Sequence, residues 1–140
     1  MIFSTTVQDK DGDGLLDVWE QNKGYTDAIP NANGQHEWVA LPDASADQRD
    51  IFVELDYLTN LDGAAGKYLH SHVPKQQALD MVGKALEMQG ITVHFDLGPG
   101  VYSDKYVVSY PVDLSNMPAG AVPPPAGAGG NAISEGTLTA

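Results

Sequence analysis

PKQQALDMVGKALEMQG, residues 74–90, is followed directly by ITVHFDL, residues 91–97, and the two runs differ in their hydrophobic period. In the first run, apolar side chains recur at three- and four-residue steps, which predicts an amphipathic helix over residues 74–89. The expected buried face consists of Ala78, Met81, Val82, Ala85 and Leu86. A proline near the start and a glycine at position 90 match the usual helix boundaries. The second run is short and apolar, and it predicts a strand over residues 91–97.

An earlier strand is expected where residues 51–58 read IFVELDYL. Its alternation divides the side chains between two faces, with Ile51, Val53, Leu55 and Tyr57 on one and Phe52, Glu54 and Asp56 on the other. Strand, helix and strand in this order predict a right-handed parallel crossover. The expected fold class is therefore α/β, a small mixed sheet that contains a βαβ unit.

Shorter segments complete the expected organisation. Residues 2–7 predict an edge strand, residues 15–22 a short helix that ends before Gly24, and residues 24–43 a surface hairpin with a strand at 36–41. Residues 102–112 predict one more strand, with Tyr106, Val108 and Tyr110 on one side. Residues 118–130, PAGAVPPPAGAGG, bury too little apolar area to offset their ordering entropy. The expected domain therefore spans residues 1–117, and residues 118–140 are expected to be a Pro/Ala/Gly-rich tail or linker.

The composition bounds the function. The chain has 140 residues, which fits one domain, and nineteen acidic against seven basic residues leave a formal charge of −12. Such an excess repels nucleic acid and anionic lipid, and it opposes folding unless cations neutralise it. With no cysteine, disulfides and thiolate metal sites are excluded. The first residues, MIFSTTVQ, contain neither a basic leader nor a long apolar run, so neither a signal peptide nor a membrane span is expected there.

The acidic run DKDGDGLLDVWE, residues 9–20, matches the calcium loop of an EF-hand. Such a loop presents oxygen ligands at positions 1, 3, 5, 7, 9 and 12 and turns sharply at a glycine at position 6. The expected ligands are Asp9, Asp11, Asp13, the carbonyl of Leu15, Asp17 and Glu20, with Gly14 at the turn. Calcium fits better than magnesium, because the last glutamate offers two oxygens to the ion. The alternative is a solvated acidic turn.

The residues before Asp9 are strand-like, so the loop is not expected to belong to a pair of helices that opens as a sensor. We expect a structural calcium ion in a module without catalysis of its own. Because several carboxylates repel one another until a cation binds the folded form, stability should depend on free calcium.

Several runs together resemble the amino-terminal region of large secreted bacterial proteins related to metzincin-type zinc metallopeptidases. These are the loop that ends in Trp19 and Glu20, then DIFVELDYL, LHSHVPKQQALDMV and GITVHFDLGPG. The resemblance covers about residues 9–130. It implies a secreted or extracellular, calcium-stabilised domain that carries the first strands and helix of a protease-like sheet. The chain has no HExxH, the zinc-binding motif that such a peptidase requires.

Two further classes of function stay open. The first is a piece of a zinc metallopeptidase whose catalytic helix lies beyond residue 140. The second is a subunit that assembles with copies of itself, in a calcium-dependent way, through sheet edges or the C-terminal arm.

The remaining polar residues suggest two weaker sites. His70, His72 and His94 would make a three-histidine zinc site if the sheet brought them together, with His36 as a further nitrogen ligand. The alternative is that the histidines before the helix cap it or face solvent. Glu54, Asp56, His94 and Asp96 would line one cleft as a second cation site or an acid/base pair, or simply form a wet sheet face.

Overall fold

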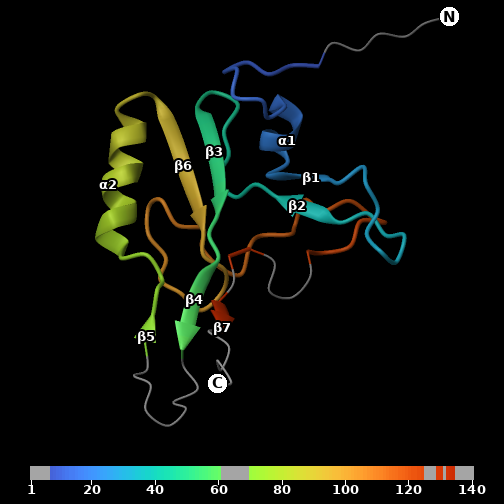
Figure 1. Ribbon diagram of the computed structural model, residues 1–140. Coiled ribbons are helices and arrows are strands. Elements are labelled where there is room, and N and C mark those ends of the chain that lie inside the picture. Colours follow the sequence, from blue (N-terminus) through green and yellow to red (C-terminus); the bar gives the residue numbers. More distant parts are fainter. Residues whose placement is uncertain (1–6, 61–69, 125–128, 131, 135–140) are drawn as a thin grey trace, which may run out of the picture.

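The computed structural model describes residues 7–60, 70–124, 129–130 and 132–134, and within them the fold is mixed α/β with small sheets and two helices (Figure 1). In chain order the elements are α1 (Asp17–Gln21), β1 (Gly24–Thr26), β2 (Trp38–Ala40), β3 (Arg49–Glu54), β4 (Tyr57–Asn60), β5 (His70–Ser71), α2 (Gln76–Glu87), β6 (Ile91–Asp96) and β7 (Ala132–Ser134). In the described part of the chain, no helix is long and apolar enough to span a membrane.

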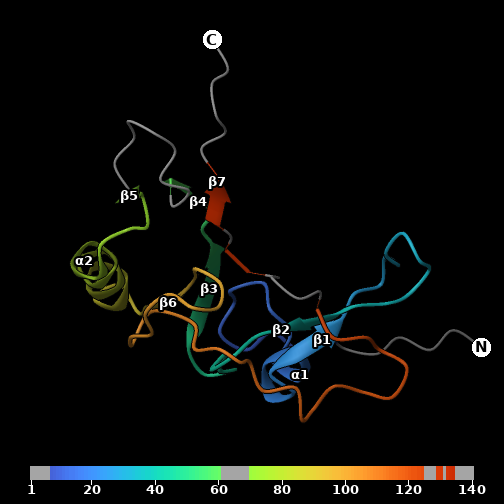
Figure 2. The ribbon, with the colours of Figure 1, turned by 90° about the horizontal axis from the view of Figure 1, so that it is seen from below.

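β3 and β6 form a parallel pair at the centre of the molecule, in register from Arg49 opposite Ile91 to Glu54 opposite Asp96. α2 lies beside β6, on the side away from α1 and the β1–β2 hairpin (Figures 1 and 2). The main core forms between α2, β6 and the chain after it, and its buried members are Leu79, Val93, Phe95, Leu97, Tyr106 and Val107. Burying side chains of this size contributes about 1.5 to 3 kcal/mol each.

The β3–β6 pair has two faces of different character, because successive side chains of a strand point to opposite sides. Val53, Val93 and Phe95 belong to the core beside α2. The other face, which we call the polar face, carries Asp50, Phe52, Glu54, His94 and Asp96 and lies toward α1 and the hairpin. The polar face therefore positions the sites described below.

The predicted helix forms, but its buried face differs from the expected one. Of the five residues expected to face the core, only Leu86 packs against it, whereas Met81 is 73% exposed and Val82 is 48% exposed. Leu79 and Gly83 are buried instead. Gly83 lets the helix approach the Tyr106 ring, since a Cβ on Gly83 would lie 2.4 Å from that ring. The helix face that packs on the core therefore contains Leu79, Gly83 and Leu86.

The predicted strand over residues 51–58 is two strands in two sheets. β3 ends at Glu54, opposite the last residue of β6, and Gly98 with a φ of 74° then turns the chain after β6 away. Without a partner beyond Asp96, the chain from Tyr57 pairs elsewhere, antiparallel with β5 and parallel with β7. Ile51, on the same face as Val53, is 42% exposed.

The hairpin prediction is confirmed, because β1 and β2 pair antiparallel with Gly24 opposite Ala40. The strand after the turn is shorter than expected, and α1 is shorter than the predicted helix. At the turn, the side chain of Asn31 accepts hydrogen bonds from the backbone N–H groups of Asn33 and Gln35, at 2.9 and 3.0 Å. This local polar bonding is typical of asparagine in turns.

The prediction of a strand over residues 102–112 is wrong. This segment meets β6 at a single bridge, where the N–H of Phe95 donates to the Tyr106 carbonyl at 2.7 Å and the N–H of Val108 donates to Phe95 at 2.9 Å. Tyr106 and Val107 are both buried, so the expected alternation is absent. Pro111 has no N–H with which to extend a ladder.

The ends of the chain have different outcomes. The edge strand expected over residues 2–7 lies outside the described residues except for Val7, which is 65% exposed. In the Pro/Ala/Gly-rich segment, the carbonyl of Val122 accepts the N–H of Trp38 at 2.9 Å, and the N–H of Val122 donates to His36 at 3.0 Å. This segment therefore contacts β2 and the residues before it. The domain boundary at residue 117 stays a prediction.

Candidate metal centre

The acidic loop folds back on its own carboxylates. Asp9 accepts hydrogen bonds from the backbone N–H groups of Gly12 and Gly14, at 2.8 and 3.1 Å. Gly14 has a φ of 97°, a conformation that favours glycine, and it occupies the position where the sequence requires a sharp turn. Asp13 accepts the N–H of Leu15 at 2.7 Å. These bonds turn the loop so that its alternate side chains converge.

Two groups of carboxylates converge, and they share Asp13. One group consists of Asp9, Asp11 and Asp13, and the other of Asp13, Glu20 and Asp50, with the potential ligand atoms of each group within 4.8 Å of one another. Four of the expected side-chain ligands are therefore brought together. Asp17 is in neither group, and one of its oxygens accepts the N–H of Lys10 at 2.8 Å. In an EF-hand loop this position often reaches calcium through a water molecule.

Glu20 is the most unusual member of the centre. It is only 1% exposed, and neither of its carboxylate oxygens has a hydrogen-bond partner among the described residues. One oxygen of Asp11 is also buried without a hydrogen-bond partner among the described residues. A buried carboxylate without a partner is strongly unfavourable, whereas a cation would supply the missing interaction.

The electrostatics agree with this geometry. Burial raises the pKa of Glu20 from 4.5 to about 7, and the negative charges of Asp11, Asp13, Asp50 and Asp17 add to the effect. Burial, followed by the charge of Asp13, also raises the pKa of Asp11. Both shifts report a site that disfavours negative charge when no cation is present.

Asp50 is the member that sequence reasoning missed. It lies on β3, outside the loop, and it is 4% exposed. Its N–H donates to Asp13 at 2.7 Å, and its carboxylate accepts the N–H of Ser45 at 2.8 Å. The other carboxylate oxygen lies 2.6 Å from Nε2 of His94, which is also buried. The available signal was an acid on the polar face of a half-buried strand, but no loop pattern linked it to residues 9–20.

The residues present fit a hard divalent cation. The ligand groups found among the described residues contain carboxylates only, and calcium and magnesium prefer such oxygens over the nitrogen and sulfur ligands typical of zinc. A glutamate with both oxygens available suits the larger coordination number of calcium, whereas magnesium usually keeps several waters.

Among the described residues, the histidines do not form the three-histidine zinc site. The metal-ligand groups found among the described residues contain no histidine. The rings of His70 and His72 lie edge to face, 5.0 Å apart, on and just after β5, while His94 is hydrogen-bonded to Asp50. His36 contacts the Asp27 carbonyl at 2.8 Å.

The predicted cleft on the sheet is partly present. Glu54 and Asp96 are opposite each other in register and line a common pocket. His94 lies on the same face but is not among the pocket residues, and Asp56 lies beyond the end of β3.

No family model matches the chain, and neither the comparison with curated proteins nor the comparison with solved structures finds a match.

Proposed function

We propose that this chain is a non-catalytic calcium-binding module, in which residues 9–20 form an EF-hand-type loop around a structural ion. Asp9, Asp11, Asp13 and Glu20 supply carboxylate oxygens, Leu15 supplies its carbonyl, and Asp17 binds directly or through water. The observation that carries the proposal is Glu20, a buried carboxylate with two unpartnered oxygens.

The role of the ion is to join the amino-terminal segment to the sheet. Asp13 accepts the N–H of Asp50 on β3, so a ligand from the loop is already bonded to the central strand pair. Neutralising the loop carboxylates removes their repulsion from Asp50. Residues 7 and 8, which precede the loop in the described part of the chain, are not helical.

The fold is consistent with a finer description. We infer that β3, α2 and β6 act as a βαβ unit, since β3 and β6 are parallel and α2 lies between them in sequence and packs on β6. The relation to metzincin-type peptidases, secretion and calcium-dependent assembly stay predictions from the sequence. An extracellular location would supply calcium at the millimolar level that weak structural sites require.

The test is calcium binding by the whole chain, measured by isothermal titration after EDTA treatment, with magnesium titrated in parallel. Glu20→Gln removes the charge of the proposed bidentate ligand. Asp80→Asn, on the outer helix α2, makes the same change in charge away from the loop and serves as the matched control. We expect the parent and the control to bind one calcium ion, and the Glu20 variant to bind at least about a hundredfold more weakly. Equal affinity in all three proteins would refute the proposal.

A further inference from the structure

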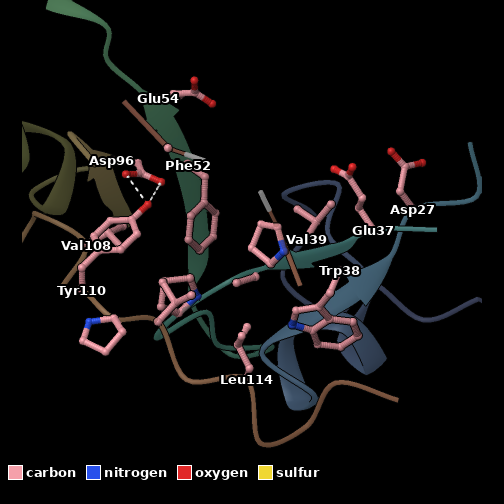
Figure 3. A pocket seen from close by; sticks show the side chains of 16 residues that line it. Asp27, Glu37, Trp38, Val39, Phe52, Glu54, Asp96, Val108, Tyr110 and Leu114 are labelled. Atoms are coloured by element: carbon pink, nitrogen blue, oxygen red, sulfur yellow. Dashed lines mark hydrogen bonds between the residues drawn. The ribbon is translucent and has the colours of Figure 1, made fainter. Parts of the chain in front are cut away.

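A second candidate site lies at the other end of the polar face. A pocket of about 630 Å³ lies between the β1–β2 hairpin, the carboxyl ends of β3 and β6, and the chain around residues 108–114 (Figure 3). Its lining shares no residue with the calcium loop. The pocket is large enough for a small organic ligand or a long side chain.

The pocket is strongly acidic. Its lining includes Asp27, Glu37, Glu54 and Asp96, and the described residues that line it include no lysine, arginine or histidine. In the view of Figure 3, Glu54 and Asp96 lie on one side of the pocket, and Asp27 and Glu37 lie on the other side, near Trp38. Glu54 and Asp96 are neighbours on adjacent strands, an arrangement in which like charges repel. A positively charged ligand would relieve this repulsion.

Asp96 is held in a fixed position. The hydroxyl of Tyr110 lies 2.8 Å from both of its carboxylate oxygens and donates to them, and the N–H of Gly98 donates to one of them at 2.9 Å. Glu54, in contrast, is exposed. The pair therefore combines one acceptor held by hydrogen bonds and one exposed acceptor.

The walls are aromatic and fixed. Phe52 is stacked on His94, with ring centroids 4.4 Å apart and an angle of 12° between the rings, and His94 is bonded to Asp50. Trp38 packs so closely on Gly24 that a Cβ there would lie 2.5 Å from the indole. Rings that are already held lose little entropy when a ligand binds.

We propose that this pocket binds a guanidinium group carried on an apolar stem. A planar guanidinium donates in-plane hydrogen bonds to carboxylates such as Glu54 and Asp96, and its flat face stacks on aromatic rings such as Phe52. The apolar walls accept the stem. An arginine side chain of a peptide and a free arginine derivative both have this chemistry. The inference goes beyond calcium binding and does not depend on it.

In the experiment, ligand probes are titrated into the full chain in the presence of calcium. Binding is measured by amide chemical shifts and by calorimetry. The small probe is Nα-acetyl-arginine amide, and its neutral isostere is the corresponding citrulline derivative. A short blocked peptide with a central arginine between leucines distinguishes a peptide ligand from a free one. Glu54→Gln and Glu54→Lys test the pocket, and Asp80→Asn is again the matched control.

We expect the arginine probe to bind at least about tenfold more tightly than the citrulline probe, and to shift amides of residues 52, 96 and 108. Glu54→Gln should weaken binding about tenfold, and Glu54→Lys should abolish it by placing a cation beside Asp96. Tighter binding of the peptide than of Nα-acetyl-arginine amide would identify a peptide as the ligand, and equal affinity of these two probes would identify a free arginine derivative. Equal binding of arginine and citrulline, or unchanged binding in both Glu54 variants, would overturn the proposal. Because the loop is intact in these variants, their calcium affinity separates this failure from failure of the proposed function.

Discussion

Replacing Glu20 with glutamine should have opposite effects on stability in the absence and in the presence of calcium. Burial and neighbouring carboxylates raise the pKa of Glu20 from 4.5 to about 7. At about pH 8 the folded, metal-free chain must hold this group ionised, which costs about 2 to 3 kcal/mol, the lower figure allowing for screening by water near the loop. Glutamine removes the charge but leaves a buried amide, so we expect a net gain of about 1 to 2 kcal/mol in EDTA.

In calcium the order should reverse. An ion at about a hundred times its dissociation constant stabilises the parent by about 2.7 kcal/mol. For a domain of this size, about 4 °C in midpoint corresponds to 1 kcal/mol. Thermal unfolding followed by circular dichroism should therefore show a midpoint about 4 to 8 °C higher for the variant in EDTA, and a calcium-induced rise of about 10 °C in the parent only.

Two results would refute this reasoning. If Glu20→Gln lowers the midpoint in EDTA as much as in calcium, Glu20 stabilises the metal-free fold and the argument from buried charge is wrong. If the variant keeps the full response to calcium, the ion binds without Glu20. Asp80→Asn, which also removes one negative charge, should show the parent's calcium response.

Three further predictions concern the fold and the pocket. Gly83→Ala should lower the unfolding midpoint by about 4 to 12 °C, the equivalent of about 1 to 3 kcal/mol, because the added Cβ would meet the Tyr106 ring. This loss should outweigh the higher helix propensity of alanine, and an unchanged midpoint would contradict the observed packing of α2. In denaturant titrations Leu79→Ala should cost about 2 to 5 kcal/mol and Met81→Ala less than about 0.5 kcal/mol, whereas equal costs would favour the helix face expected from the sequence. Burial, and then a hydrogen bond to a carboxylate, raise the pKa of Tyr110 in the folded chain. The protonated hydroxyl therefore stabilises the fold below the ordinary tyrosine pKa of about 10, and this contribution is lost only as the pH rises through the higher pKa of the folded chain. At about pH 11 the folded parent and Tyr110→Phe should gain equal tyrosinate absorbance, and a gain larger by one tyrosine in the parent would contradict the assignment.

The parts that were predictable from the sequence are those encoded locally. The spacing of Asp9, Asp11, Asp13 and Glu20 fixes which side chains converge once the chain turns at Gly14, and all of this lies within one short segment. The α2 helix was likewise readable from its period and from the proline and glycine at its ends. Each of these features depends on neighbours that are close in the chain.

The parts that were missed depend on contacts between distant segments. Gly83 gave no hydrophobic signal, yet it faces the core because the Tyr106 ring needs the space. The run 51–58 reads as one strand, but β6 ends opposite Glu54, and a pattern cannot show where the partner stops. Asp50 joins the metal centre from β3, thirty residues beyond the end of the loop. In each case the deciding information belongs to the partner segment.

The polar face of the β3–β6 pair gives these observations a common explanation. One end holds Asp50, bonded to the loop through Asp13, and the other end holds Glu54 and Asp96 at the pocket. Between them Phe52 and His94 are stacked, and His94 is bonded to Asp50. A face that was simply hydrated would not bury Asp50 and His94 or fix Asp96 with a tyrosine. The cost of concentrating negative charge on one side of a two-stranded pair is offset if cations bind at both ends, calcium in the loop and a guanidinium in the pocket.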